Sequence, residues 1–131
     1  MADILIEDII DIVRGVIVDE AGSGITTMFS NDDIGTAINL AKSTLFRDKP
    51  LAFTFSTSTD SSNHNNIDLP SLSEPSNINI PLSGAPTIAM EQWAKMALVY
   101  KTSAILVAQK SKDSYYRDIA DDLERKYREN L

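Results

Sequence analysis

The sequence predicts a mainly α-helical fold, namely a four-helix bundle with an inserted β-rich arm. The first indication is that apolar residues recur at helical spacing in four separate stretches. The second is a change of composition in 56–83, where Ser, Thr and Asn dominate and Lys and Arg are absent. The third is the length of 131 residues, because one compact domain typically holds about 100–200 residues. We expect a single domain, 1–131, with helices over about 3–18, 31–46, 86–109 and 114–130 and the arm over about 51–83.

The first expected helix, 3–18, has one apolar face and one charged face. Asp3 is placed to cap it, and the acidic residues of its first turn suit the positive end of the helix dipole. Gly22 and Gly24 interrupt the pattern and indicate a turn. The apolar face consists of Ile6, Ile9, Ile10, Val13, Val16 and Ile17.

The second expected helix opens with a capping box. The Ser30 hydroxyl can accept from the amide of Asp33, while the Asp33 carboxylate reaches back to Ser30. Phe29, just outside the helix, is placed to pack against Ile34 as a hydrophobic staple. The helix should stop before Pro50, because a proline disfavours the α conformation in the residue before it.

The expected arm begins with a strand in which Leu51, Phe53 and Phe55 alternate with smaller residues. An ordered arm or hairpin of short strands, with its tip near 61–66, is one interpretation, because a structureless loop of this length is unusual in a compact domain. Disorder of the whole arm is the alternative. The apolar residues spaced by two within the arm are Ile67 and Leu69, then Ile78, Ile80 and Leu82.

The third expected helix is the central helix of the core, and Pro86 suits its first turn. Trp93 and Tyr100 lie seven residues apart on its apolar face, which favours a place in the core over a ligand cage. In the last helix, Tyr115 and Tyr116 cannot both face the core, so one of them is a candidate for an interface. Its expected ion pairs are Asp121 with Arg125, Asp122 with Lys126 and Glu124 with Arg128.

Catalytic chemistry has few residues to draw on. The chain has no cysteine and one histidine, His64, which lies in a polar stretch with no acid at a defined spacing to orient it. The adjacent acids Asp32–Asp33 and Asp121–Asp122 do not face one another on a helix, so they indicate a helix start and a solvated surface. We expect no enzyme activity and no catalytic, cofactor-binding or metal-binding residue.

Charge and hydropathy limit the partners. The net charge is −7, and no segment carries the clustered Lys and Arg that bind phosphates. No apolar run approaches the roughly 20 residues that span a bilayer, and the acidic N-terminus is unlike a secretory signal. We expect a soluble protein that contacts no membrane.

The order of these elements resembles the head-to-tail adaptor, or connector, proteins of tailed bacteriophages, which complete the head. The resemblance covers nearly the whole chain. Its most specific part is 28–45, where an aromatic residue, a serine and two acids (Phe29 to Asp33) open a helix that carries Ala37-Ile38-Asn39. The stretch 85–108 also resembles the second core helix of that family, since it follows a proline-rich segment and is rich in alanine.

The resemblance implies a virion structural protein, made in the host cytoplasm and located at the head-to-tail interface. Such subunits form a homo-oligomeric ring, usually of twelve, that binds the portal protein and meets a tail or nozzle protein. DNA passes through the ring during genome ejection as a non-specifically contacted cargo, which acidic walls would repel rather than hold. Some members dock into the portal through a C-terminal extension; this chain ends at Leu131, so its last helix would make that contact or the role lies elsewhere.

The alternative function is a small helical partner-binding or regulatory domain whose exposed arm recognises a protein.

The adaptor interpretation gives two sets of residues as hypotheses, one lining the channel and one forming interfaces. The acids expected to line the channel are Asp8, Asp11, Asp32 and Asp33. The expected interface residues are Ile67, Leu69, Ile78, Ile80, Leu82, Tyr115, Arg125, Tyr127, Arg128 and Leu131.

Overall fold

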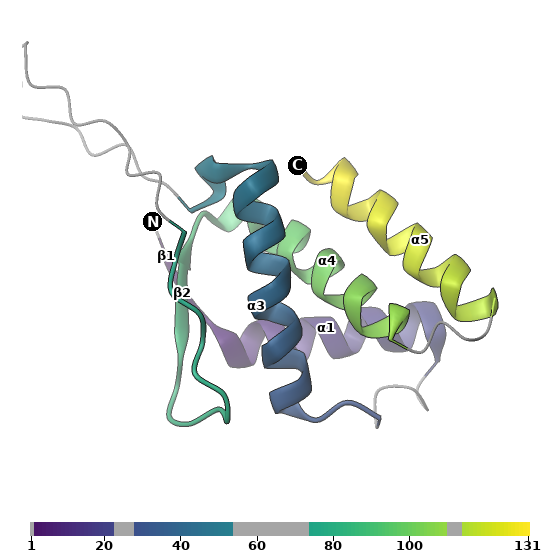
Figure 1. The fold of residues 1–131 in the computed structure, drawn as a ribbon, viewed down its shortest axis with the longest axis horizontal. Helices are drawn as coiled ribbons and strands as arrows, with labels where there is room; N and C mark the ends of the chain where they lie inside the picture. Colours follow the sequence, from purple (N-terminus) through teal and green to yellow (C-terminus); the bar gives the residue numbers. More distant parts are fainter. Residues whose placement is uncertain (1, 23–27, 54–73, 110–113) are drawn as a thin grey trace, which may run out of the picture.

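The computed structural model describes residues 2–22, 28–53, 74–109 and 114–131 (Figure 1). Within these ranges the chain is mainly helical, as predicted, and a small two-stranded antiparallel sheet lies beside the helices. The elements are β1 (Ala2–Leu5), α1 (Ile6–Ala21), α3 (Asn31–Asp48), the 3-10 turn η1 (Pro50–Ala52), β2 (Thr87–Met90), the 3-10 turn η2 (Gln92–Ala94), α4 (Lys95–Ala108) and α5 (Ser114–Glu129).

The sheet corrects the predicted start of the first helix. β1 pairs antiparallel with β2, so that Asp3 lies opposite Ala89 and does not cap a helix. The residue before α1 is Leu5, which makes no side-chain hydrogen bond to the helix. Strand pairing decides this segment because it buries Ile4 beside the helices.

The sheet also corrects the predicted third helix. Its first part is β2 and η2, and α4 begins only at Lys95. Pro86 does not open a helix; its carbonyl accepts a hydrogen bond of 2.9 Å from the amide of Ile6. This hydrogen bond joins the start of α1 to the residue before β2, so two elements that are far apart in the sequence lie side by side.

The predicted capping box of α3 is confirmed. The Ser30 hydroxyl accepts from the Asp33 amide at 3.0 Å, and the Asp33 carboxylate accepts from the Ser30 amide at 3.0 Å. Phe29 and Ile34 are both buried in the core, as a staple requires. α3 ends at Asp48, two residues before Pro50.

The predicted strand after α3 is wrong over its described part, 51–53. Pro50 opens the turn η1, whose end is fixed by a 3.1 Å hydrogen bond from the Phe53 amide to the Pro50 carbonyl. Leu51 is 56% exposed while Ala52 and Phe53 are buried, so the alternation does not persist. Other predictions for the arm lie outside the described residues: Phe55, the tip near 61–66 with His64, and the interface candidates Ile67 and Leu69.

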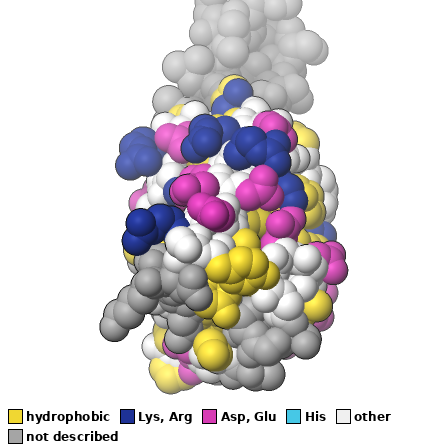
Figure 2. All heavy atoms as spheres, turned by 90° about the vertical axis from the view of Figure 1, so that its right-hand side faces the viewer, with side chains coloured by type: hydrophobic (Ala, Val, Ile, Leu, Met, Phe, Trp, Pro, Cys, Tyr) yellow, Lys and Arg dark blue, Asp and Glu magenta, His cyan; other side chains and the backbone are white. Residues whose placement is uncertain are grey.

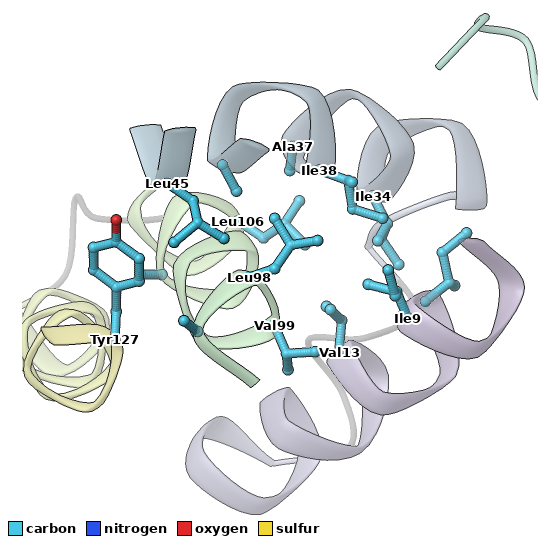
Figure 3. Packing of buried hydrophobic residues seen from close by; sticks show 14 of the residues in the cluster. Ile9, Val13, Ile34, Ala37, Ile38, Leu45, Leu98, Val99, Leu106 and Tyr127 are labelled. Carbon is cyan, nitrogen blue, oxygen red and sulfur yellow. The ribbon is translucent and has the colours of Figure 1, made fainter. Parts of the chain in front are cut away.

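α4 is the central helix, as predicted, and it packs against α1, α3 and α5. Figure 3 shows Leu98 and Leu106 of α4 directed into the space between α3 and α1, toward Ile38 and Val13. Thr102 and Ser103 are also buried on α4, and their hydroxyls donate to backbone carbonyls one turn earlier. A helix that is buried on nearly all sides lies inside a core rather than on its edge.

α5 confirms the predicted last helix, and Ile119, Leu123 and Tyr127 form its buried side. Trp93, in contrast, is 49% exposed, so its predicted place in the core is wrong. The reason is that Trp93 belongs to the turn η2 and not to the helix whose spacing placed it. Tyr100, which does lie on α4, packs against the core.

Candidate interaction surface on helix α3

The segment 74–83, which we call the strap, runs along α3 between that helix and β2 (Figure 1). The predicted strands of the arm are not found in it, because neither a helix nor a strand is assigned within 74–83. Its backbone is held mainly by side chains of α3. These side chains, together with Gly35, form what we call the α3 stripe: Asp32, Gly35, Asn39 and Lys42, which the spacing of three and four residues places on one face of the helix.

Asn39 binds the main chain of the strap at Ile78. Its side-chain amide donates to the Ile78 carbonyl at 3.1 Å, and its side-chain oxygen accepts from the Ile78 amide at 2.8 Å. The carboxamide thus pairs with both backbone groups of one residue, as a neighbouring strand would. This contact fixes the register of the strap and is independent of the Ile78 side chain.

Lys42 holds the beginning of the strap. Its Nζ donates to the Pro75 carbonyl at 2.5 Å and to the side-chain oxygen of Asn77 at 2.6 Å. Only 1% of the Lys42 surface is exposed. Burial lowers the pKa of the Lys42 ammonium below its ordinary value of 10.5, and the charge of Glu74 acts in the opposite direction.

Asp32 and Gly35 hold the end of the strap. The Asp32 carboxylate accepts from the Leu82 amide at 2.9 Å. At Gly35 a Cβ atom would lie 2.8 Å from Cδ1 of Ile80 and 3.4 Å from Cδ2 of Leu82. The absence of a side chain at Gly35 therefore lets the apolar residues of the strap approach the helix.

Two open hollows flank the strap. One, of about 290 Å³, lies between the strap and the start of β2 and is lined by Ser76 to Asn79, Ser83, Pro86 and Thr87. The other, of about 280 Å³, lies between the end of the strap and the starts of α1 and α3, and its polar residues are Glu7, Asn31, Asp32 and Ser83. Among the described residues, no buried side-chain nitrogen or oxygen lacks a hydrogen-bond partner. Neither hollow therefore presents an unpaired buried group to a ligand.

The interface candidates on the strap are placed differently from one another. Ile78 and Leu82 are half-buried and pack against the core, whereas Ile80 is 39% exposed beside Gly35. Ile78 and Leu82 are thus engaged within the chain itself. The sequence pattern identified these residues but attributed their spacing to a strand.

The candidates near the C-terminus also separate into engaged and exposed residues. Tyr127 is 2% exposed and its hydroxyl donates to Asp48 at 2.7 Å, so its contacts lie within the chain. Leu131 packs against the core. Tyr115, Arg125 and Arg128 are exposed, and Tyr116 is the tyrosine that packs inward.

One of the three ion pairs predicted for α5 is found, and the other two are replaced by different pairs. Asp122 with Lys126 is confirmed at 3.5 Å. Arg125 pairs with Asp122 and Glu129, both at 2.6 Å, in place of Asp121. Figure 2 shows basic and acidic side chains interspersed on the face that it presents, which favours such local pairing.

The remaining predicted pair, Glu124 with Arg128, is replaced by tertiary contacts. Glu124 binds Lys101 of α4 at 2.5 Å, and Lys126 of α5 binds Glu20 of α1. These pairs tie α5 to two other helices.

The four acids expected to line a channel also have different environments. Asp8 and Asp11 are exposed on α1. Asp33 is exposed at the start of α3, where its carboxylate completes the capping box. Asp32 is half-buried and binds the strap. Two of these acids thus have a structural role in addition to any role of their charge.

Sequence reasoning missed the α3 stripe as a unit. Lys42 continues the apolar stripe of Ile38, Ala41 and Leu45, which was a signal that this lysine is buried. Gly35 in the middle of a helix was another, because glycine there costs about 1 kcal/mol relative to alanine without a packing reason. Neither feature of the sequence predicts that the strap is the segment that binds these residues.

No comparison identified a relative. No family model matches the chain, and neither a curated protein nor a solved structure matches it. Among the described residues, no cluster of three or more His, Cys, Asp or Glu side chains could hold a metal ion. The helices of that same part of the chain are too short or too polar to cross a membrane.

Tyr127→Phe tests the contact between α5 and α3. Burial, and then the hydrogen bond to Asp48, raise the pKa of Tyr127 above 10.0. The folded chain thus keeps a proton that the unfolded chain releases, so this stabilisation is complete below pH 10.0 and is lost as the pH rises toward the folded-state pKa. We expect the substitution to lower the free energy of unfolding by about 0.5–1.5 kcal/mol near neutral pH.

The measurement is urea unfolding near neutral pH and at a pH above 10.0. The difference between wild type and Tyr127→Phe should shrink at the higher pH. Tyr115→Phe is the matched control, because Tyr115 is 54% exposed on the same helix; it should change the free energy by less than about 0.5 kcal/mol. Equal effects of the two substitutions would contradict the assignment.

Proposed function

We propose that the chain is a virion structural protein of a tailed bacteriophage, a four-helix adaptor that forms a ring, of about twelve subunits by family resemblance, between the portal vertex and the tail. The observation that carries this proposal is the order of elements. A first helix is followed by a helix with a capping box, an insertion, a central helix and a charged last helix. The same order underlies the resemblance to head-to-tail adaptors.

Exposed apolar side chains supply a surface for subunit or portal contacts. Leu51 is 56% exposed and Trp93 is 49% exposed. The amide of Glu91 donates to the carbonyl of Ala52 at 2.8 Å, which brings together the turns η1 and η2 that carry these two residues. We call this region the Leu51–Trp93 corner. Exposed tryptophans are frequent centres of protein interfaces, because they bury a large apolar area on binding.

The exposed acids of α1 support a conduit for DNA. Asp8 and Asp11 carry negative charge on the surface of a chain whose net charge is −7. A polyanion gains no fixed contact from such a wall, so it can slide past. In this proposal the subunit performs mechanical work and no catalysis.

The experiment is co-expression of the chain with the portal protein of the same genome, followed by imaging of the purified complex. We expect a closed ring of this chain on the portal. The double variant Leu51→Ala/Trp93→Ala should reduce the fraction of portals that carry a ring. Leu40→Ala is the matched control, since Leu40 is a 54% exposed apolar residue on α3.

The adaptor proposal would be contradicted if the chain did not copurify with the portal protein and were also absent from purified phage particles. The Leu51–Trp93 corner would then favour the second candidate, a helical domain that binds another protein. A ring that tolerates the double variant would retain the adaptor function but would place the contacts elsewhere.

A further inference from the structure

The α3 stripe recognises the main chain of the strap. Asn39 binds the amide and carbonyl of Ile78, Asp32 binds the amide of Leu82, and Lys42 binds the carbonyl of Pro75. We propose that the α3 stripe is a docking site for an extended peptide, and that the strap of a second copy of this chain can occupy it. The chain's own strap is then one of two possible occupants.

The contacts define the ligand. It offers a backbone carbonyl at one position, both backbone groups three residues later, and a backbone amide four residues after that. It also carries apolar side chains at alternate positions, because Ile78 and Leu82 pack against the core and Ile80 lies against Gly35. An extended segment meets these requirements, since alternate side chains then point to the same side.

Apart from the α3 stripe, the strap is held mainly by Ile78 and Leu82, which pack against the core. Most of its residues are exposed, including Ser76, Asn79 and Pro81. On its other side lies the hollow of about 290 Å³ that separates it from the start of β2. The apolar contacts of Ile78 and Leu82 are lost when the strap leaves, but an identical segment makes the same contacts again, so the exchange itself costs little.

A second copy is the occupant that the chemistry favours. Its strap presents the same Pro75, Ile78 and Leu82 groups, so every hydrogen bond of the stripe is remade after exchange. Exchange of an identical element between copies is a low-cost route to association. This inference goes beyond the proposed function, because exchange needs two copies and no portal.

The test uses the full chain with its own strap disabled by Ile78→Asp/Leu82→Asp. A fluorescently labelled peptide of residues 74–84 is titrated with this variant, and binding is followed by fluorescence anisotropy. We expect saturable binding. Adding Asn39→Ala should weaken it about tenfold, because two hydrogen bonds to the peptide are lost. Adding Thr36→Ala, an exposed position on the same helix, should leave it unchanged.

A second strap variant, Ile78→Gly/Leu82→Gly, provides the same test without buried charges should the first not fold. The wild-type chain should bind the peptide more weakly than either variant, since its own strap competes. Absence of saturable binding to the folded variants, or binding that Asn39→Ala does not change, would overturn the proposal.

Discussion

Leu98→Ala should lower the free energy of unfolding by about 2–5 kcal/mol, the range for truncation of a buried leucine. Leu98 is fully buried on α4, the helix that packs against α1, α3 and α5. Figure 3 shows it near the centre of the cluster, with Ile38 on one side and Val13 on the other. The substitution leaves a cavity that three rigid helices cannot fill, so transfer and cavity costs add.

Urea unfolding followed by circular dichroism measures this effect. Leu40→Ala is the control, because it removes the same atoms from a 54% exposed leucine of α3 and should change the free energy by less than about 0.5 kcal/mol. If Leu98→Ala cost no more than Leu40→Ala, α4 would not be the centre of the core.

The elements predicted correctly are those specified by nearby residues. The capping box of α3 needs only Ser30 and Asp33, which are three residues apart. α5 needs only a strong apolar stripe on a charged helix, and Leu123 and Tyr127 lie on it as buried residues. Such signals act within one or two helical turns, so they can be recognised without knowledge of the fold.

The sheet was missed because its two strands are distant in sequence. Ile4 pairs with Ile88, and each strand has only four residues. Over so short a length, one buried residue between two exposed ones fits a helix as well as a strand. The pairing therefore depends on tertiary contacts, among them the hydrogen bond from Ile6 to Pro86.

The strap was missed for a related reason. The alternation of Ile78, Ile80 and Leu82 correctly indicated apolar contacts, since Ile78 and Leu82 pack against the core, but it suggested pairing with a strand. The partner is instead a helix, whose Asn39 carboxamide supplies the donor and acceptor that a strand would. The spacing of apolar residues therefore identifies a segment that makes apolar contacts and not the kind of element that binds it.

Lys42→Ala should lower the free energy of unfolding by about 2 kcal/mol, near the low end for loss of a long buried side chain. The aliphatic stem of Lys42 fills space between α3 and the strap, and only 1% of the residue is exposed. The ammonium also binds Pro75 and Asn77. Relief of the buried charge offsets part of the loss.

Lys42→Met separates the stem from the ammonium, because methionine keeps most of the volume and removes the charge. We expect it to lie within about 1 kcal/mol of wild type near neutral pH, since lost hydrogen bonds and relieved desolvation oppose one another. Urea unfolding of both variants provides the comparison. If Lys42→Met were as costly as Lys42→Ala, the hydrogen bonds to the strap would dominate and packing of the stem would be secondary.

The pH dependence gives an independent measure of the buried ammonium. Burial lowers the pKa of Lys42 in the folded chain below 10.5, so in the window below 10.5 the unfolded chain binds more protons than the folded chain. The contribution of Lys42 to the free energy of unfolding therefore rises as the pH rises through that window. The stability of wild type relative to Lys42→Met should rise as the pH approaches 10.5 from below. A constant difference would mean that the ammonium is hydrated in the folded protein and that the strap lies less closely on α3.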